Sequence, residues 1–185
     1  SAGPQEKDEL KAERRELLPG IEKMLSLMEK AGVNDPVQRW EFLYRKSLFC
    51  IDAARGQDAL TCIKEMKDRI SGFSDMRLGQ YANYIMRLIL CVYDLKRGAG
   101  DEVVEQVKVL EKEVDVMVED IVGRLSCLGQ SDFQAEIQYD PDGFLTDITR
   151  WFHCTDRGEK NIALLEKALV MNPREVTSRM LLLAA

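Results

Sequence analysis

The feature that most limits the fold of this chain is an almost unbroken helical periodicity. Apolar residues recur every three or four positions along most of the 185 residues, and Gly, Pro and Asp residues separate the periodic segments. The sequence has no run of alternating Val, Ile, Thr and aromatic residues bounded by hairpin turns. This pattern predicts roughly six to eight helices joined by short turns, and therefore an all-α fold.

Proline and glycine signals mark the first helix boundaries. Segment 1–18 is highly charged, and Pro19 stands where a new helix is expected to begin, because a first-turn residue needs no N–H donor. We expect Gly32 to end that helix. Asp35 followed by Pro36 predicts the next helix start, with the aspartate as the N-cap.

The helix that follows Pro36 is expected to stop at Gly56. Further helices are expected over residues 57–73, 75–98, 101–128, 144–154, 157–171 and 173–185. The segment 129–143 is interpreted as a connecting loop. We interpret 1–185 as a single repeat-like domain. Its apolar end suggests either a fragment of a larger protein or a surface that a partner normally covers.

Composition excludes several classes of protein. Lys and Arg number 26 against 32 Asp and Glu, a net charge of -6, and 45% of the residues are hydrophobic. An acidic balance argues against nucleic acid as the main partner. No apolar run approaches the roughly 18 residues that would suggest a membrane span.

Five cysteines indicate the redox environment. An odd number cannot close into a full set of internal disulfides, and no pair has CxxC spacing. Cys50, Cys62 and Cys91 fall among apolar residues at helical spacing, so we expect them to be buried free thiols. This favours a reducing compartment, the cytoplasm or the nucleus.

Two stretches carry a repeat-like pattern. In the first, Ser47 and Ala59 are small residues that would let two antiparallel helices approach closely. The apolar residues around them are Leu43, Cys50, Ile63 and Met66. The second stretch, 159–173, has Leu165, Ala168, Leu169 and Pro173 in a characteristic order, with Leu145, Ile148 and Phe152 on the expected partner helix.

This second stretch resembles the second half of a tetratricopeptide repeat. Taken over both stretches, the resemblance covers roughly 75 of the 185 residues and matches the family's pattern only in part. It implies stacked antiparallel helix hairpins that form a short right-handed superhelix. It also implies a concave face that binds peptides or partner helices, and no catalysis.

Two surfaces are candidate partner-binding sites. The first is a basic groove lined by Arg45, Arg77 and Arg87, which would receive an acidic peptide or a C-terminal carboxylate. Arg39 and Lys46 would contribute to the same groove. The alternative is that these arginines are ordinary solvent-exposed side chains without a binding role.

The second candidate is the long helix that begins at Asp101. Val107, Val114 and Met117 belong to a heptad-like apolar seam on it. The helix carries eight acidic residues against three basic ones, so most of the net charge lies there. An exposed seam would dock a partner helix, whereas the alternative is an internal helix with a solvated acidic face.

The sequence contains no recognised catalytic or metal-binding motif. His153 and Cys154 are adjacent on an expected helix and so point about 100° apart, and the turn 140–143 matches a calcium loop at neither end. We predict no catalytic residues, no metal site and no cofactor.

These observations predict a non-enzymatic scaffold or adaptor module of an intracellular assembly that binds another protein. The alternatives are a peptide- or ligand-sensing domain of a transcription regulator and an enzyme without a recognised motif. Nucleic acid and membrane are not expected partners, and self-association stays open.

Overall fold

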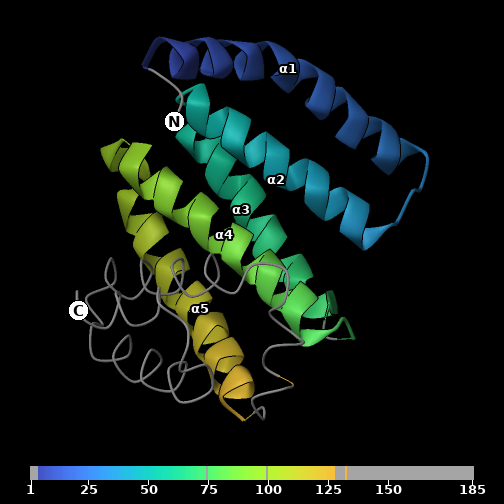
Figure 1. Ribbon diagram of the computed structural model, residues 1–185. Helices are drawn as coiled ribbons and strands as arrows, with labels where there is room; N and C mark the ends of the chain where they lie inside the picture. Colours follow the sequence, from blue (N-terminus) through green and yellow to red (C-terminus); the bar gives the residue numbers. More distant parts are fainter. Residues whose placement is uncertain (1–3, 74, 99, 128–131, 133–185) are drawn as a thin grey trace. The chain divides into compact units, whose positions relative to one another are not determined.

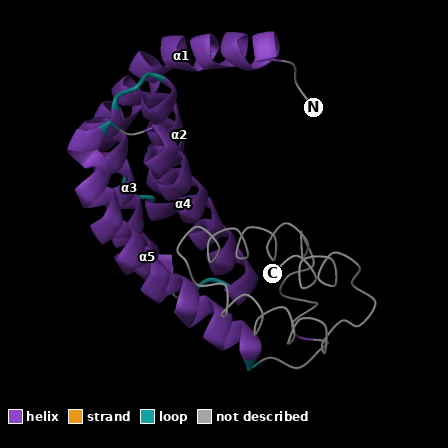
Figure 2. Cartoon of the chain, turned by 90° about the vertical axis from the view of Figure 1, so that its left-hand side faces the viewer, coloured by secondary structure: helices purple, strands orange, loops and turns teal. Residues whose placement is uncertain are grey.

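The computed structural model describes residues 4–73, 75–98, 100–127 and 132. These residues form five α-helices and one short 3-10 helix, and they contain no strand (Figures 1 and 2), which confirms the all-α prediction for this part of the chain. The elements are α1 (Pro4–Lys30), α2 (Pro36–Asp52), α3 (Gly56–Ile70), η1 (Ser71–Phe73), α4 (Leu78–Gly98) and α5 (Asp101–Ser126).

Several predictions fall on residues that the structure does not describe. Apart from Asp132, the loop 129–143 and the helices expected after it lie outside the described residues, as does the repeat-like stretch 159–173.

The chain separates into two compact units that share helices α4 and α5. The first unit comprises residues 1–74 and 90–112, and so contains α1, α2, α3, the end of α4 and the start of α5. The second unit comprises residues 75–89 and 113–185. No helix of the described residues combines the length and the hydropathy that a crossing of the bilayer requires.

The α2–α3 hairpin forms the centre of the first unit, and its helices lie side by side in Figure 1. Ser47 and Ala59 are both fully buried, as the predicted close approach of the two helices requires. Ser47 Oγ donates to the Tyr44 carbonyl at 2.8 Å and lies 3.4 Å from Cys91 Sγ on α4, so its hydroxyl is satisfied inside the core. The predicted apolar residues of this hairpin are all buried: Leu43, Cys50, Ile63 and Met66.

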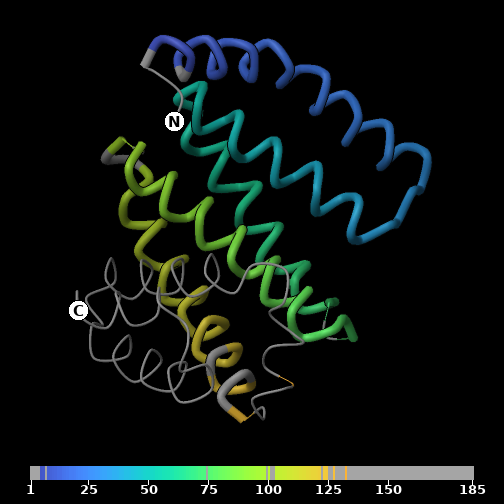
Figure 3. The backbone as a smooth tube through the Cα atoms, viewed as in Figure 1, coloured from blue at the N-terminus to red at the C-terminus, as the bar shows by residue number. Residues whose placement is uncertain are grey.

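Helix α1 does not follow its prediction, because it continues through Pro19 instead of starting there. Pro19 has no N–H to donate to the preceding turn, an omission that bends or breaks a helix. Figure 3 shows a bend near the middle of α1 and no break. Leu18 and Leu25 are buried on either side of Pro19, and Arg14 pairs with Asp52 at 3.1 Å. Packing on α2 along both halves therefore keeps α1 continuous.

The ends of α1 and α2 close with the same hydrogen-bond pattern, the Schellman motif. At the end of α1, Val33 N–H donates to the Met28 carbonyl at 2.9 Å, and Gly32 has a φ of +64°. At the end of α2, Arg55 N–H donates to the Cys50 carbonyl at 2.8 Å, and the left-handed residue is Ala54 with a φ of 58°.

The prediction that α2 stops at Gly56 is therefore wrong: α2 ends at Asp52, and Gly56 opens α3. The stop signal at the end of α2 is an alanine, which carries no glycine signature in the sequence. The start of α2 is as predicted, because Asp35 Oδ1 accepts from the N–H groups of Val37 and Gln38 at 3.0 and 3.1 Å.

We expect Ala54→Gly to stabilise the protein by about 0.5–1 kcal/mol. The left-handed conformation costs an L-residue roughly 1–2 kcal/mol, of which the greater flexibility of glycine in the unfolded chain cancels a part. Gly32→Ala is the matched control, since a Cβ there would meet nothing within 4 Å and only the φ of +64° opposes it. Urea unfolding should show opposite shifts for the two variants, and a loss of stability in Ala54→Gly would contradict the expectation.

The second unit is built from the start of α4 and the end of α5. Its buried apolar residues are Ala82, Ile85, Met86, Leu88, Ile89, Val114, Val118 and Ile121. The guanidinium of Arg124 lies 5.5 Å from the centre of the Tyr81 ring, a cation–π contact between the two helices.

Candidate functional site

Two arginines from neighbouring helices of the first unit converge on one carboxylate. Arg39 on α2 donates through Nε to Glu65 Oε1 at 2.8 Å, and Arg69 on α3 approaches the same oxygen with Nε and Nη2, each at 2.8 Å. The three side chains are half-buried. Two cations share one anion, so the trio carries a net charge of +1.

Burial alone would raise the pKa of Glu65, but the hydrogen bonds from Arg39 and Arg69 outweigh it and hold the pKa below its ordinary value. Glu65 is therefore ionised at neutral pH and keeps both guanidinium groups in place.

The backbone beneath these arginines is fixed by buried contacts. Trp40, the residue after Arg39, is fully buried and donates through Nε1 to the Met66 carbonyl, one residue beyond Glu65, at 3.1 Å. Its ring stacks on that of Tyr44 with centroids 5.7 Å apart. This hydrogen bond joins α2 to α3 at the level of the site, so the two arginines stand on a rigid base.

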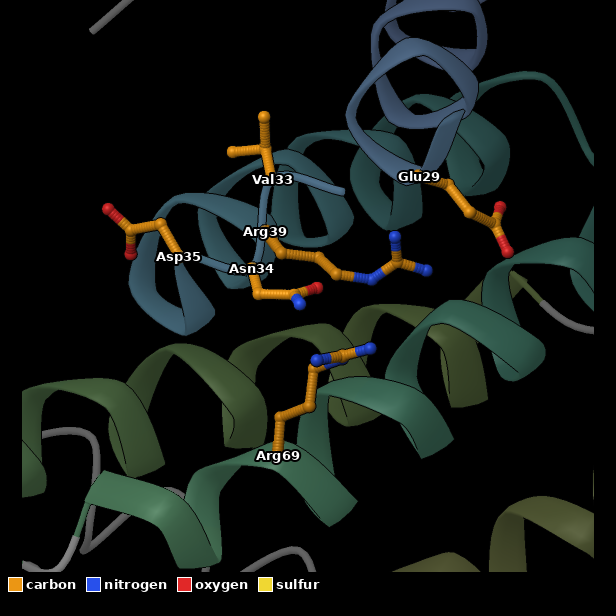
Figure 4. Close-up of a pocket in the computed structure, with 6 residues that line it drawn as sticks. All are labelled: Glu29, Val33, Asn34, Asp35, Arg39 and Arg69. Carbon is orange, nitrogen blue, oxygen red and sulfur yellow. The ribbon is translucent and has the colours of Figure 1, made fainter. Parts of the chain in front are cut away.

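A cavity of about 340 Å³ opens beside the arginines, under the turn that joins α1 to α2. Its lining residues are Glu29, Val33, Asn34, Asp35, Arg39 and Arg69. Figure 4 shows the guanidinium groups of Arg39 and Arg69 turned toward each other, with the Asn34 amide beside them. Val33 and Asp35 point away from both arginines in the same view.

The arrangement has the donors that bind a carboxylate. Arg39 contacts Glu65 through Nε. Its two terminal nitrogens, Nη1 and Nη2, lie on the side of the cavity that Glu29 borders (Figure 4). A planar guanidinium recognises a carboxylate through paired N–H donors. The volume falls at the low end of the roughly 300–1,000 Å³ of small-ligand pockets, enough for one side chain or one chain end.

The predicted arginine groove is divided between the two units. Arg45 is exposed on α2 of the first unit. Arg77 is exposed just before α4, and Arg87 is half-buried with its guanidinium 5.7 Å from the centre of the Tyr84 ring, both in the second unit. Of the arginines that the sequence placed in that groove, Arg39 alone lines the cavity described above.

The exposed seam proposed for the long helix has to be corrected. Val107 and Val114 are 1% and 0% exposed, and Met117 is half-buried. The two valines pack inside the protein and offer no surface to a partner helix. Helix α5 therefore matches the alternative prediction, an internal helix with a solvated acidic face.

No pattern in the sequence marks Arg69 and Asn34 as members of one site. The spacing of Glu65 and Arg69, one helical turn apart, is an available signal for an ion pair. Nothing local marks Arg39 as the third member, since it stands 26 residues before Glu65 and meets it only through helix packing.

The cysteine prediction is confirmed where the structure describes it. Cys50, Cys62 and Cys91 are free and buried, whereas Cys127 is free and exposed. Burial raises the pKa of Cys50 and raises that of Cys62 to about 12, so both stay protonated at neutral pH. Over the described residues, no cluster of His, Cys, Asp and Glu side chains has the composition to hold a metal ion.

Comparison of the chain with protein-family models, with curated proteins and with solved structures finds no match. The interpretation of the cavity therefore depends on its own geometry.

Proposed function

We propose that this protein is a non-enzymatic binding module, a scaffold or adaptor of an intracellular assembly, that takes a carboxylate-bearing segment of another protein into the cavity beside Arg39 and Arg69. The observation that carries the proposal is the convergence of two half-buried guanidinium groups on Glu65, at the wall of a cavity of about 340 Å³. Glu65 neutralises only one of the two guanidinium charges. The other faces a cavity that Glu29 and Asp35 also border, so a suitable occupant brings N–H donors as well as a carboxylate.

The acidic rim favours a peptide over a simple anion. Glu29 borders the cavity on the side opposite Arg69, and its charge opposes the entry of a bare anion (Figure 4). A peptide segment presents N–H donors next to a carboxylate, so it can satisfy Glu29 and Arg39 together. Asp35 adds less repulsion, because its carboxylate already accepts two backbone N–H groups of α2.

The tetratricopeptide-like character of the chain belongs to the same proposal. Its support is the α2–α3 hairpin, in which the small buried residues Ser47 and Ala59 lie on facing helices. Repeats of this kind present their partners with a rigid surface built from consecutive hairpins. A short right-handed superhelix of such hairpins would extend the binding surface beyond the cavity.

The test is an array of peptides of varied sequence, each with either a free or an amidated C-terminus. The wild-type protein should retain peptides with a free C-terminus or an acidic side chain. Arg39→Gln should weaken their binding about 10- to 100-fold, the usual cost of losing a hydrogen bond between charged groups. Arg39→Lys should recover only part of the affinity, because an ammonium lacks the paired donors.

The matched control is Arg45→Gln, which removes the same charge from an exposed position of the same helix. Fluorescence polarisation of the retained peptides should give equal affinities for this variant and the wild type. Equal losses in Arg39→Gln and Arg45→Gln, or no discrimination between carboxylate and amide ends, would refute the proposed site.

A further inference from the structure

The outward face of α1 carries an uncovered row of large apolar side chains. Leu10, Leu17 and Met24 follow one another at intervals of seven residues and are 46%, 59% and 45% exposed, and Leu27 is 48% exposed. Residues seven apart lie on nearly the same side of a helix. With Gly20, which stands three residues after Leu17, these residues form what we call the α1 stripe.

A row of charged residues runs beside the α1 stripe. Glu9, Glu16, Lys23 and Lys30 each stand one residue before a stripe position or before Ala31, again at intervals of seven. All four are exposed, and none forms an ion pair within the described part of the chain. The first half of the row is acidic and its second half is basic.

We propose that the α1 stripe binds the α1 stripe of a second copy of this chain, with the two helices antiparallel. This pairing sets Glu9 against the second copy's Lys30, and Glu16 against its Lys23. Both pairs are centred on the same point, between Pro19 and Gly20, so one two-fold axis satisfies all four charges of each copy. The inference is independent of the cavity beside Arg39.

The apolar residues fit the same register. When the charged pairs are level in an antiparallel coiled coil, the stripe layers place Leu10 against the second copy's Leu27 and Leu17 against its Gly20. The same register places Met24 against the second copy's Glu13, so the apolar contacts are concentrated in the other two layers. A Cβ at Gly20 would meet nothing within 4 Å, so the space over this glycine is open to an incoming leucine. The two helices therefore approach most closely next to the axis.

Charge complementarity selects a second copy as the occupant. An isologous interface must be complementary to itself, and a row that changes sign at its midpoint has this property only in the antiparallel direction. In a parallel pair, each acidic residue of the row would instead lie level with the same acidic residue of the other copy.

The experiment measures the mass of the full chain by sedimentation velocity, with charge-swapped variants. The wild type should form dimers at a concentration of about 100 µM, in the range of weak specific association. K23E/K30E and E9K/E16K should each be monomeric, with a dissociation constant raised at least about tenfold, because every attraction across the axis becomes a repulsion. An equimolar mixture of these two variants should form a heterodimer, and the quadruple variant E9K/E16K/K23E/K30E should dimerise again.

The matched control is K11E/K112E, which changes the net charge as K23E/K30E does but at exposed lysines outside the row. It should dimerise like the wild type, and helical circular dichroism should verify that every variant is folded. A monomeric wild type at about 100 µM overturns the proposal. So does a dimer that persists in both double variants, a mixture that fails to associate, or a monomeric control.

Discussion

Replacing Val114 with glutamate is expected to destabilise the protein by at least about 3 kcal/mol, since a buried charge without a partner costs several kcal/mol. Val114 is 0% exposed on the inner face of α5, between the buried residues Leu110 and Val118. The introduced carboxyl group would avoid part of the cost by staying protonated, so its pKa would rise in the folded state. The destabilisation should therefore be greatest at neutral pH and should decrease as the pH falls toward about 4, the pKa of an unperturbed glutamate.

Val116→Glu is the control for this prediction. Val116 stands two residues further along the same helix and is 67% exposed. The same substitution should change stability there by no more than about 0.5 kcal/mol. Thermal unfolding followed by circular dichroism compares the two variants directly. If both unfold at the temperature of the wild type, the burial of the α5 seam described above is wrong.

Replacing Trp40 with alanine is expected to cost about 3–5 kcal/mol, the usual loss for a large aromatic side chain in a core. The substitution empties a fully buried site, removes the stacking on Tyr44, and takes away the hydrogen bond to the Met66 carbonyl. The joint between α2 and α3 beneath Arg39 and Arg69 would be lost with it. Urea unfolding should show the loss as a lower midpoint.

Trp40→Phe separates the hydrogen bond from the packing. Phenylalanine keeps most of the apolar contact but lacks the indole N–H, so we expect a smaller loss of about 1–2 kcal/mol. Equal effects of Trp40→Phe and Trp40→Ala would mean that the hydrogen bond to Met66 outweighs the packing, contrary to this expectation.

The parts of the fold that the sequence predicted are those governed by local chemistry. The cap at Asp35 with Pro36 needs only the first turn of α2, so the residues themselves identify it. Two of the helix boundaries where prediction failed, at Pro19 and Ala54, carry no reliable local signal. Pro19 lies inside α1 because burial on α2 offsets a proline penalty of about 3 kcal/mol, and Ala54 adopts a left-handed conformation without the glycine that usually marks it.

In the candidate site, too, the sequence predicted the type of residue but not which residues come together. The sequence indicated that arginines suit a carboxylate-binding surface and included Arg39 among them. It had no means to group Arg39 with Glu65 and Arg69, because the residues come from different helices and meet only when α2 packs on α3. Arg77 and Arg87, which the sequence grouped with Arg45, belong to the other unit.

By itself, the sequence determined that the described chain is helical, where α2 begins, and which side of each helix is apolar, because these properties depend on residues within a few turns of one another. Only the tertiary structure decided which apolar faces are covered. Val107 and Val114 are buried while Leu17 is exposed, although all three belong to apolar rows of heptad spacing. The physical reason is that periodicity fixes the direction of a side chain relative to its own helix axis, whereas the packing of residues far apart in the chain decides which neighbour covers it.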